Sequence, residues 1–168
     1  MDKRWIYIII ILIIGVSALY SIASSSNTIG SATLDVSTFV ITLPDQFHID
    51  QAENDMAALI NRDTNEKLII TDSGKGDSVD SNIQDTMKKF KKINSVEIEN
   101  NTITYKNITI KTVYMIFDDG TINSTTYFMK FNHTFNINAN NFNDKESILD
   151  NIKFLIDSLE RDYKQTQD

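Results

Sequence analysis

Side chains suited to acid–base or metal chemistry are few in this sequence. It contains two histidines, His48 and His133, and no cysteine. Neither histidine has a companion ligand at the spacing of a metal site. The lack of cysteine excludes disulfides, thiolate metal sites, cysteine nucleophiles and a lipid-modified cysteine. We therefore expect no catalytic residue, no cofactor and no metal site.

Two short segments resemble ligand-binding loops. The segment SGKGDS at 73–78 leads into a predicted helix, and helix N-termini often bind anions. It lacks the spacing of a Walker loop, so we interpret it as a glycine-rich connector. The segment Asp118-Asp119-Gly120 lacks the remaining oxygen ligands of a calcium loop, and a hairpin turn explains it better.

The environment of His133 depends on where the chain around it turns. Six apolar side chains of residues 127–139 fall on odd positions, namely Tyr127, Met129, Phe131, Phe135, Ile137 and Ala139. One straight strand would point His133 into the core, whereas a three-residue loop at 132–134 would pair Phe131 with Phe135. Because a strand of that length would be unusually long, we expect the loop and an exposed His133.

Five residues are candidates for contact with a partner. Lys88, Lys89, Lys91 and Lys92 form a basic cluster on an otherwise acidic domain. The cluster is either a solvated helix face or a surface for membrane headgroups or an acidic partner. Phe154 falls on the side of the last predicted helix opposite its apolar stripe, and is a candidate for contact with a partner.

Four asparagines occupy glycosylation sequons: Asn100, Asn107, Asn123 and Asn132. A sequon requires a surface position in an exported protein to be modified. The composition alone gives nearly as many sequons by chance, since Asn, Ser and Thr are frequent. They remain candidate glycosylation sites.

The first 23 residues contain a membrane-insertion signal. Residues 5–23 carry no charge and would span about 28 Å as a helix at roughly 1.5 Å per residue, close to the thickness of a bilayer core. Lys3 and Arg4 precede this run, so we expect residues 1–4 to be cytoplasmic and the remainder to be exported. The alternative is a signal peptide cleaved after Ala23, which would release a secreted protein.

The net charge limits the partners of the exported part. The whole chain has 16 Lys and Arg, 23 Asp and Glu and a net charge of -7. Without Asp2, Lys3 and Arg4 these counts become 14 and 22, so the exported part carries -8. Such a charge repels phosphate backbones, and we expect no nucleic-acid partner.

The segments beyond the anchor read as a linker, a mixed domain and a tail. Residues 24–35 are small and polar, which predicts a flexible linker, and residues 164–168 form a polar tail. Between them, at 36–163, alternating strands and two amphipathic helices predict an α+β domain. The helices are expected near 79–93 and 144–163. Their predicted N-caps are Asp77 or Ser78 for the first, and Asn143 in a capping box with Glu146 for the second.

The strand at 108–117 sets the expected architecture. Ile108, Ile110 and Tyr114 share one face of it, while Val113 and Met115 share the other. An apolar residue on both faces means that both are covered. An antiparallel sheet with a helix on each face satisfies this requirement and the element order.

This pattern resembles the PsbP/DcrB-like α/β/α sandwich superfamily over about residues 36–160. The resemblance is carried by FVITLPDQF at 39–47, the following hairpin and helix, YFMKFNHTFNI at 127–137 and the closing helix ILDNIKFLIDSL at 148–159. It implies a sandwich fold. Members with known roles are mostly accessory or binding modules, and the superfamily has no common catalytic residues to transfer to this chain.

We therefore expect a membrane-anchored extracytoplasmic domain that binds or scaffolds an unidentified protein or small molecule and is not an enzyme. One alternative is a hydrolase that uses only carboxylates and hydroxyls, which requires two acidic side chains to converge in a pocket. The other is a small-molecule sensor with its pocket between sheet and helix.

The anchor makes a prediction that fractionation can test. Because residues 5–23 are long enough to span a bilayer, membranes washed with carbonate should retain the chain at its full 19.2 kDa. Recovery of a shorter soluble species that starts at Ser24 would instead show that the segment is a cleaved signal.

Overall fold

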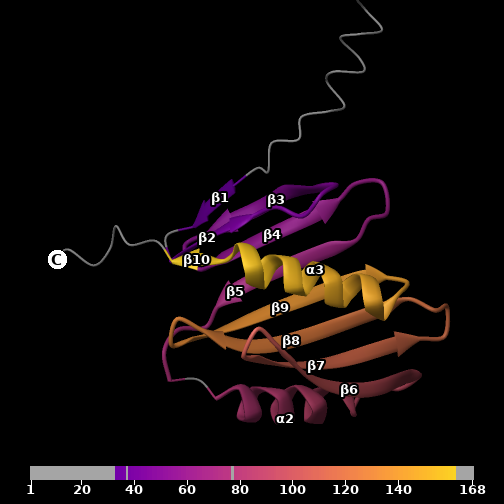
Figure 1. The fold of residues 1–168 in the computed structure, drawn as a ribbon. Helices are drawn as coiled ribbons and strands as arrows, with labels where there is room; N and C mark the ends of the chain where they lie inside the picture. Colours follow the sequence, from indigo (N-terminus) through magenta and orange to yellow (C-terminus); the bar gives the residue numbers. More distant parts are fainter. Residues whose placement is uncertain (1–32, 37, 77, 162–168) are drawn as a thin grey trace, which may run out of the picture. The chain divides into compact units, whose positions relative to one another are not determined.

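The computed structural model describes residues 33–36, 38–76 and 78–161, which form ten strands and two helices (Figure 1). The strands before the first helix are β1 (Thr33–Val36), β2 (Phe39–Thr42), β3 (Phe47–Glu53), β4 (Met56–Asn61) and β5 (Lys67–Asp72). After α2 (Val79–Phe90) come β6 (Val96–Tyr105), β7 (Ile108–Phe117), β8 (Ile122–Lys130) and β9 (His133–Phe142). The chain then continues through α3 (Lys145–Ser158) into β10 (Glu160–Arg161).

The strands form two antiparallel sheets. The larger one has seven strands in the order β3-β4-β5-β9-β8-β7-β6, and the smaller one has the order β1-β2-β10. The larger sheet consists of two meanders, one from β3 to β5 and one from β6 to β9, which join where β5 pairs with β9. The predicted antiparallel sheet with two helices is therefore present.

The main core lies on the face of the large sheet that α3 covers. From α3 and its C-cap Leu159 it takes Ile148, Ile152, Leu155, Ile156 and Leu159 itself. From the sheet it takes residues such as Ile70, Phe128 and Ile137. Phe39 and Ile41 of the small sheet are fully buried in the same cluster. Apolar residues alternate along these strands, so the apolar face of the sheet points toward α3.

The opposite face is covered at β7 and β8 by α2. Val113 of β7 is fully buried there, although it lies outside the main core. Only Ile83 and Thr86 of α2 are buried, and the Thr86 hydroxyl lies 3.1 Å from that of Tyr127. The prediction that β7 is covered on both faces is therefore confirmed. On its second face, however, the covering helix α2 buries only two residues, one of them polar.

The beginning of α2 agrees with the sequence, and its end does not. The Ser78 side chain accepts a hydrogen bond from the backbone N–H of Ser81 and caps the helix, as predicted. The predicted apolar stripe ended at Ile93, but the helix ends at Phe90 and Ile93 is 46% exposed. A backbone with positive φ at Ser95 turns the chain toward β6 instead.

The boundaries of α3 also differ from the prediction. The N-cap is Asp144 rather than Asn143, because the Asp144 carboxylate accepts the backbone N–H of Ser147 at 2.8 Å. The helix ends at Ser158 rather than 163, because Leu159 becomes extended and residues 160–161 join β2 as β10. Pairing with a distant strand therefore ends this helix, and no local stop signal is needed.

The domain also begins earlier than predicted. Residues 33–35, assigned to the linker at 24–35, belong to β1, and Leu34 is buried opposite Ile41. The predicted anchor at 5–23, the cytoplasmic residues 1–4 and the tail at 164–168 lie outside the described residues. Within residues 33–161, where described, no helix is long and apolar enough to cross a bilayer.

The buried face of α3 can be tested by a pair of substitutions. Ile152→Ala should lower the free energy of unfolding by about 2 to 5 kcal/mol, because Ile152 is fully buried and its truncation leaves a cavity. Lys153→Ala should change it by less than about 0.5 kcal/mol, since the Lys153 amine only makes a surface pair with Asp150. Urea unfolding of the two variants measures the difference, and equal losses would mean that the buried face is assigned wrongly.

Candidate functional site

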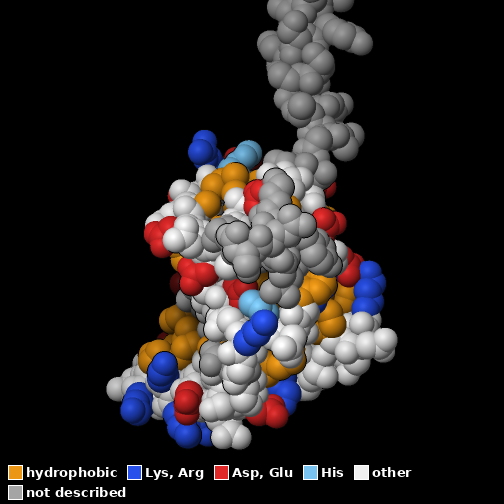
Figure 2. All heavy atoms as spheres, turned by 90° about the vertical axis from the view of Figure 1, so that its left-hand side faces the viewer, with side chains coloured by type: hydrophobic (Ala, Val, Ile, Leu, Met, Phe, Trp, Pro, Cys, Tyr) orange, Lys and Arg blue, Asp and Glu red, His pale blue; other side chains and the backbone are white. Residues whose placement is uncertain are grey.

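Several polar side chains make contacts near one end of the large sheet. This end lies on the left in Figure 1. We call this the hairpin end. It contains the β6–β7 turn, the β8–β9 turn, the end of β5 and the end of α3. Figure 2 faces it and shows hydrophobic patches set between separate acidic and basic side chains. No single kind of side chain dominates the visible surface.

The β8–β9 turn is tighter than predicted. It consists of two residues, Phe131 and Asn132, with φ of 55° and 63°, and Lys130 pairs with His133 across it. Positive φ at both positions is the geometry of a type I′ hairpin turn. The predicted three-residue loop at 132–134 is therefore wrong. Phe135 pairs with Phe128, not Phe131, and their ring centroids lie 5.5 Å apart.

The tighter turn directs His133 inward, which corrects the prediction that it is exposed. Its side chain is 17% exposed, and Nδ1 lies 2.9 Å from both carboxylate oxygens of the buried Asp72. An ionised carboxylate only accepts hydrogen bonds, so Nδ1 carries the hydrogen and donates it. In the neutral ring, Nε2 is then left as an acceptor.

The acceptor nitrogen faces a small enclosed space. Nε2 of His133 and the hydroxyl of Thr38 are both buried without a hydrogen-bond partner among the described residues. Both residues line a hollow that is too small to hold a water molecule, which we call the His133 hollow. The described residues that line it are Thr38, Phe39, Asp72, Phe131, His133 and Phe135.

The SGKGDS connector is attached to the same place. Asp72 also accepts the backbone N–H of Gly74 at 2.8 Å, and Gly74 has φ of 85°. Backbone bonds from Ser73 to Thr134 and from Thr134 to Gly74, at 2.9 and 3.0 Å, continue the β5–β9 pairing into the connector. These contacts agree with the interpretation of SGKGDS as a glycine-rich connector.

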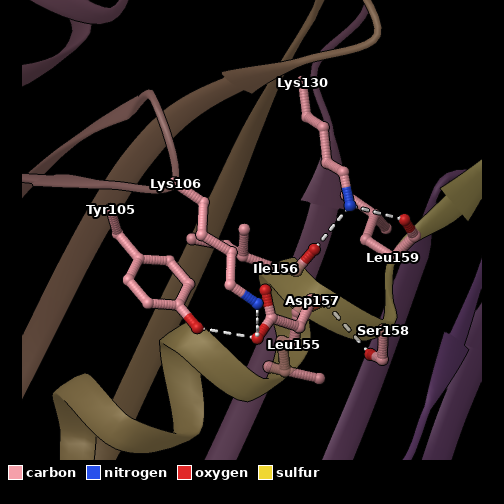
Figure 3. A network of polar contacts seen from close by, with 8 residues as sticks. All are labelled: Tyr105, Lys106, Lys130, Leu155, Ile156, Asp157, Ser158 and Leu159. Atoms are coloured by element: carbon pink, nitrogen blue, oxygen red, sulfur yellow. Dashed lines mark hydrogen bonds and ion pairs between the residues drawn. The ribbon is translucent and has the colours of Figure 1, made fainter.

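A lysine from the sheet closes the C-terminal end of α3 (Figure 3). The last turn of α3 contains no basic residue. Instead, Nζ of Lys130 donates hydrogen bonds to the backbone carbonyls of Ile156 and Leu159 at 2.5 and 2.7 Å. Helix ends leave such carbonyls without partners within the helix, and a cation there also opposes the helix dipole. Burial lowers the pKa of Lys130.

Asp157 forms the second part of this network. Its carboxylate accepts hydrogen bonds from the Tyr105 hydroxyl and the Lys106 amine, each at 2.7 Å. These bonds lower the pKa of Asp157, with the Lys106 bond contributing most, and the same bond raises the pKa of Lys106. A carboxylate at a helix C-terminus is otherwise unfavourable, so the β6–β7 turn supplies the missing cation.

The predicted contact residues lie elsewhere on the domain. Lys88, Lys89, Lys91 and Lys92 are exposed at the end of α2 and just after it. Lys88 pairs with Asp85 at 3.1 Å, which is a surface contact within the helix. The structure therefore does not bring this cluster to the hairpin end.

Phe154 is 41% exposed and borders a shallow depression of about 560 Å³ near the start of α3. The depression is lined by Pro44, Asp45, Asp144, Glu146, Ser147, Asp150, Asn151 and Phe154. Four of the eight lining residues are acidic, namely Asp45, Asp144, Glu146 and Asp150. Asp144 is already engaged there as the cap of α3.

The four sequons differ in accessibility. Asn100, Asn107 and Asn132 are exposed, the last two in hairpin turns. Asn123 is half-buried, and its side-chain oxygen accepts the backbone N–H of Asn141 at 2.9 Å. Three of the four positions are thus open to a modifying enzyme.

The sequence pattern did not identify Thr38, Asp72, Lys130 or Asp157 as parts of a site. Asp72 ends a predicted strand just before Gly74, which by itself indicates only a turn. Its partner His133 lies on the strand that pairs with β5, and that pairing carries no local signal.

We compared the chain with protein-family models, with curated proteins and with solved structures, and only the solved structures gave a match. No protein-family model matches the sequence, and no curated protein matches it. Among solved structures, the chain is similar to the solution structure of cyanobacterial PsbP (CyanoP) from Synechocystis sp. PCC 6803. The identity is 7% and the TM-score 0.48, over 80% of this chain and 96% of that chain.

The lysine at the end of α3 yields a testable prediction. Lys130→Met keeps the apolar stem but leaves the carbonyls of Ile156 and Leu159 without their donor. The free energy of unfolding should fall by about 1 to 3 kcal/mol. Lys106→Met removes an equal charge from an exposed pair and should cost clearly less. Urea unfolding compares the two, and a smaller loss for Lys130→Met would contradict its assigned role.

Proposed function

We propose that this chain is a non-catalytic binding or scaffold domain, held on the outer side of a membrane by residues 5–23. The proposal combines the apolar N-terminal segment with a folded domain that carries a net acidic charge. The bound partner is either a protein or a small molecule.

The observation that carries the non-catalytic role is the enclosure of the Asp72–His133 pair. A general base must reach the proton it removes, directly or through one water. With the Phe131 ring in place over the hollow, Nε2 of His133 instead faces a space without room for water. The pair attaches the β8–β9 hairpin to the end of β5, which supports a holding role.

The two alternatives have less support. A carboxylate hydrolase would need two acids in different environments, such as one buried and one solvated. The acids at the depression beside Phe154 face solvent together, and Asp144 is engaged as a helix cap. A sensor pocket between sheet and α3 would need unfilled space, whereas Phe128, Phe142 and Ile137 are fully buried in that layer.

The proposed orientation can be tested by labelling, because the chain contains no cysteine of its own. A single cysteine at the exposed Asp119 turn should react with a membrane-impermeant maleimide in intact cells. A cysteine in place of Asp2 should react only after the cells are permeabilised. The opposite pattern, with Asp2→Cys labelled first, would show that the domain faces the cytoplasm.

The proposed lack of catalysis can be tested on the purified full-length chain. Ester, glycoside and phosphate-ester probes should show no turnover above the background of a boiled control. Turnover that is lost in His133→Gln or in Asp150→Asn would contradict the proposal and would identify which of the two acid–base sites is active.

A further inference from the structure

The His133 hollow contains two of the three buried side-chain polar atoms that lack a partner in the described part of the chain. A buried polar atom without a partner has lost its hydrogen bonds to water and gained none in the protein, which destabilises the fold. Two such atoms line the same hollow, so the unfavourable free energy of both is located at one place in the fold. Native structures keep few of them, and each calls for a physical explanation.

The chemistry of the two atoms is complementary to a hydroxyl group. In the neutral imidazole Nε2 of His133 is an acceptor, because Nδ1 holds the ring hydrogen against Asp72. The Thr38 hydroxyl can donate its hydrogen. A hydroxyl between them would donate to Nε2 and accept from Thr38. Water has the required hydroxyl, but the closed hollow has no room for it.

Phe131 is the part of the lining that can move aside. Phe39 and Phe135 are buried in the core, whereas Phe131 is 39% exposed on a two-residue turn. Its φ of 55° is an unfavourable backbone conformation for a bulky aromatic residue. The Lys130 amine lies 4.9 Å from the centroid of this ring. A swing of the ring into solvent would break that contact and open the hollow beside Phe39 and Phe135.

We propose that the His133 hollow is a closed binding site for a small planar ligand that carries a neutral hydroxyl group, of which phenol is the simplest. The ligand hydroxyl donates to Nε2 of His133 and accepts from Thr38, while its ring takes the place of Phe131. An anionic ligand is disfavoured, because the Asp72 carboxylate lies directly behind the imidazole. This inference rests on the proposed binding role and gives it a ligand class.

Nitrogen NMR of the full-length chain, labelled only in its histidines, tests the proposal with phenol as the probe. The chain has two histidines, so His48 is an internal control. Phenol should shift the Nε2 signal of His133 in the direction of an accepted hydrogen bond and leave His48 unchanged. Toluene, which has the ring without the hydroxyl, should leave Nε2 unshifted.

A pair of turn variants tests the role of Phe131. Phe131→Gly suits the positive φ and removes the ring, so the phenol affinity should rise roughly tenfold or more as the closed form is lost. Asn132→Gly relaxes the same turn but keeps the ring, and the affinity should stay at the wild-type value. An equal rise in both variants would show that turn flexibility, not ring removal, controls binding.

The ligand class is refuted if phenol fails to move the His133 signal in Phe131→Gly at concentrations up to its solubility, or if toluene moves it equally. Either result leaves the binding or scaffold role intact, because that role is tested separately by labelling and turnover. Conversely, turnover by the purified chain would contradict the non-catalytic role without changing the phenol response.

Discussion

The two-residue turn at Phe131 and Asn132 determines which side chains of β8 and β9 face α3. Side chains alternate along a strand, so one more or one fewer turn residue would exchange the two faces of β9 relative to β8. With this turn, the rings of Phe128 and Phe135 stack in the main core. The same turn fixes the positions from which Lys130 and His133 leave the hairpin. The core, the helix cap and the His133 hollow therefore depend on one local backbone conformation.

The hairpin end also shows how charges from the sheet complete a helix. The last turn of α3 has an acidic residue, Asp157, and no basic one. Lys106 pairs with its carboxylate, and Lys130 binds the free carbonyls behind it. The end of α3 is therefore stable only when it is docked on the large sheet. Helix formation and sheet assembly are coupled at this point.

Features with a periodic or local signal could be predicted from the sequence. The apolar stripe of α3, the strand with two covered faces and the Ser78 cap follow from spacing and from side chains a few residues apart. The β8–β9 turn could not be predicted, because Phe131 has none of the Asn-Gly chemistry that marks a type I′ turn. The Asp72–His133 pair required knowledge that β5 lies beside β9. The end of α3 likewise depended on a distant strand, β2.

The pairing of β2 with β10 has a consequence for the order in which the domain can be assembled. Val40 lies opposite Glu160, so the first and last parts of the domain form one small sheet. Synthesis proceeds from the N-terminus, and non-local pairings must wait until both partners exist. Until α3 has been made, Phe39 and Ile41 lack the cover that buries them in the finished domain. The nascent chain therefore exposes these apolar side chains until α3 has been synthesised, and binding by a chaperone is most useful during that interval.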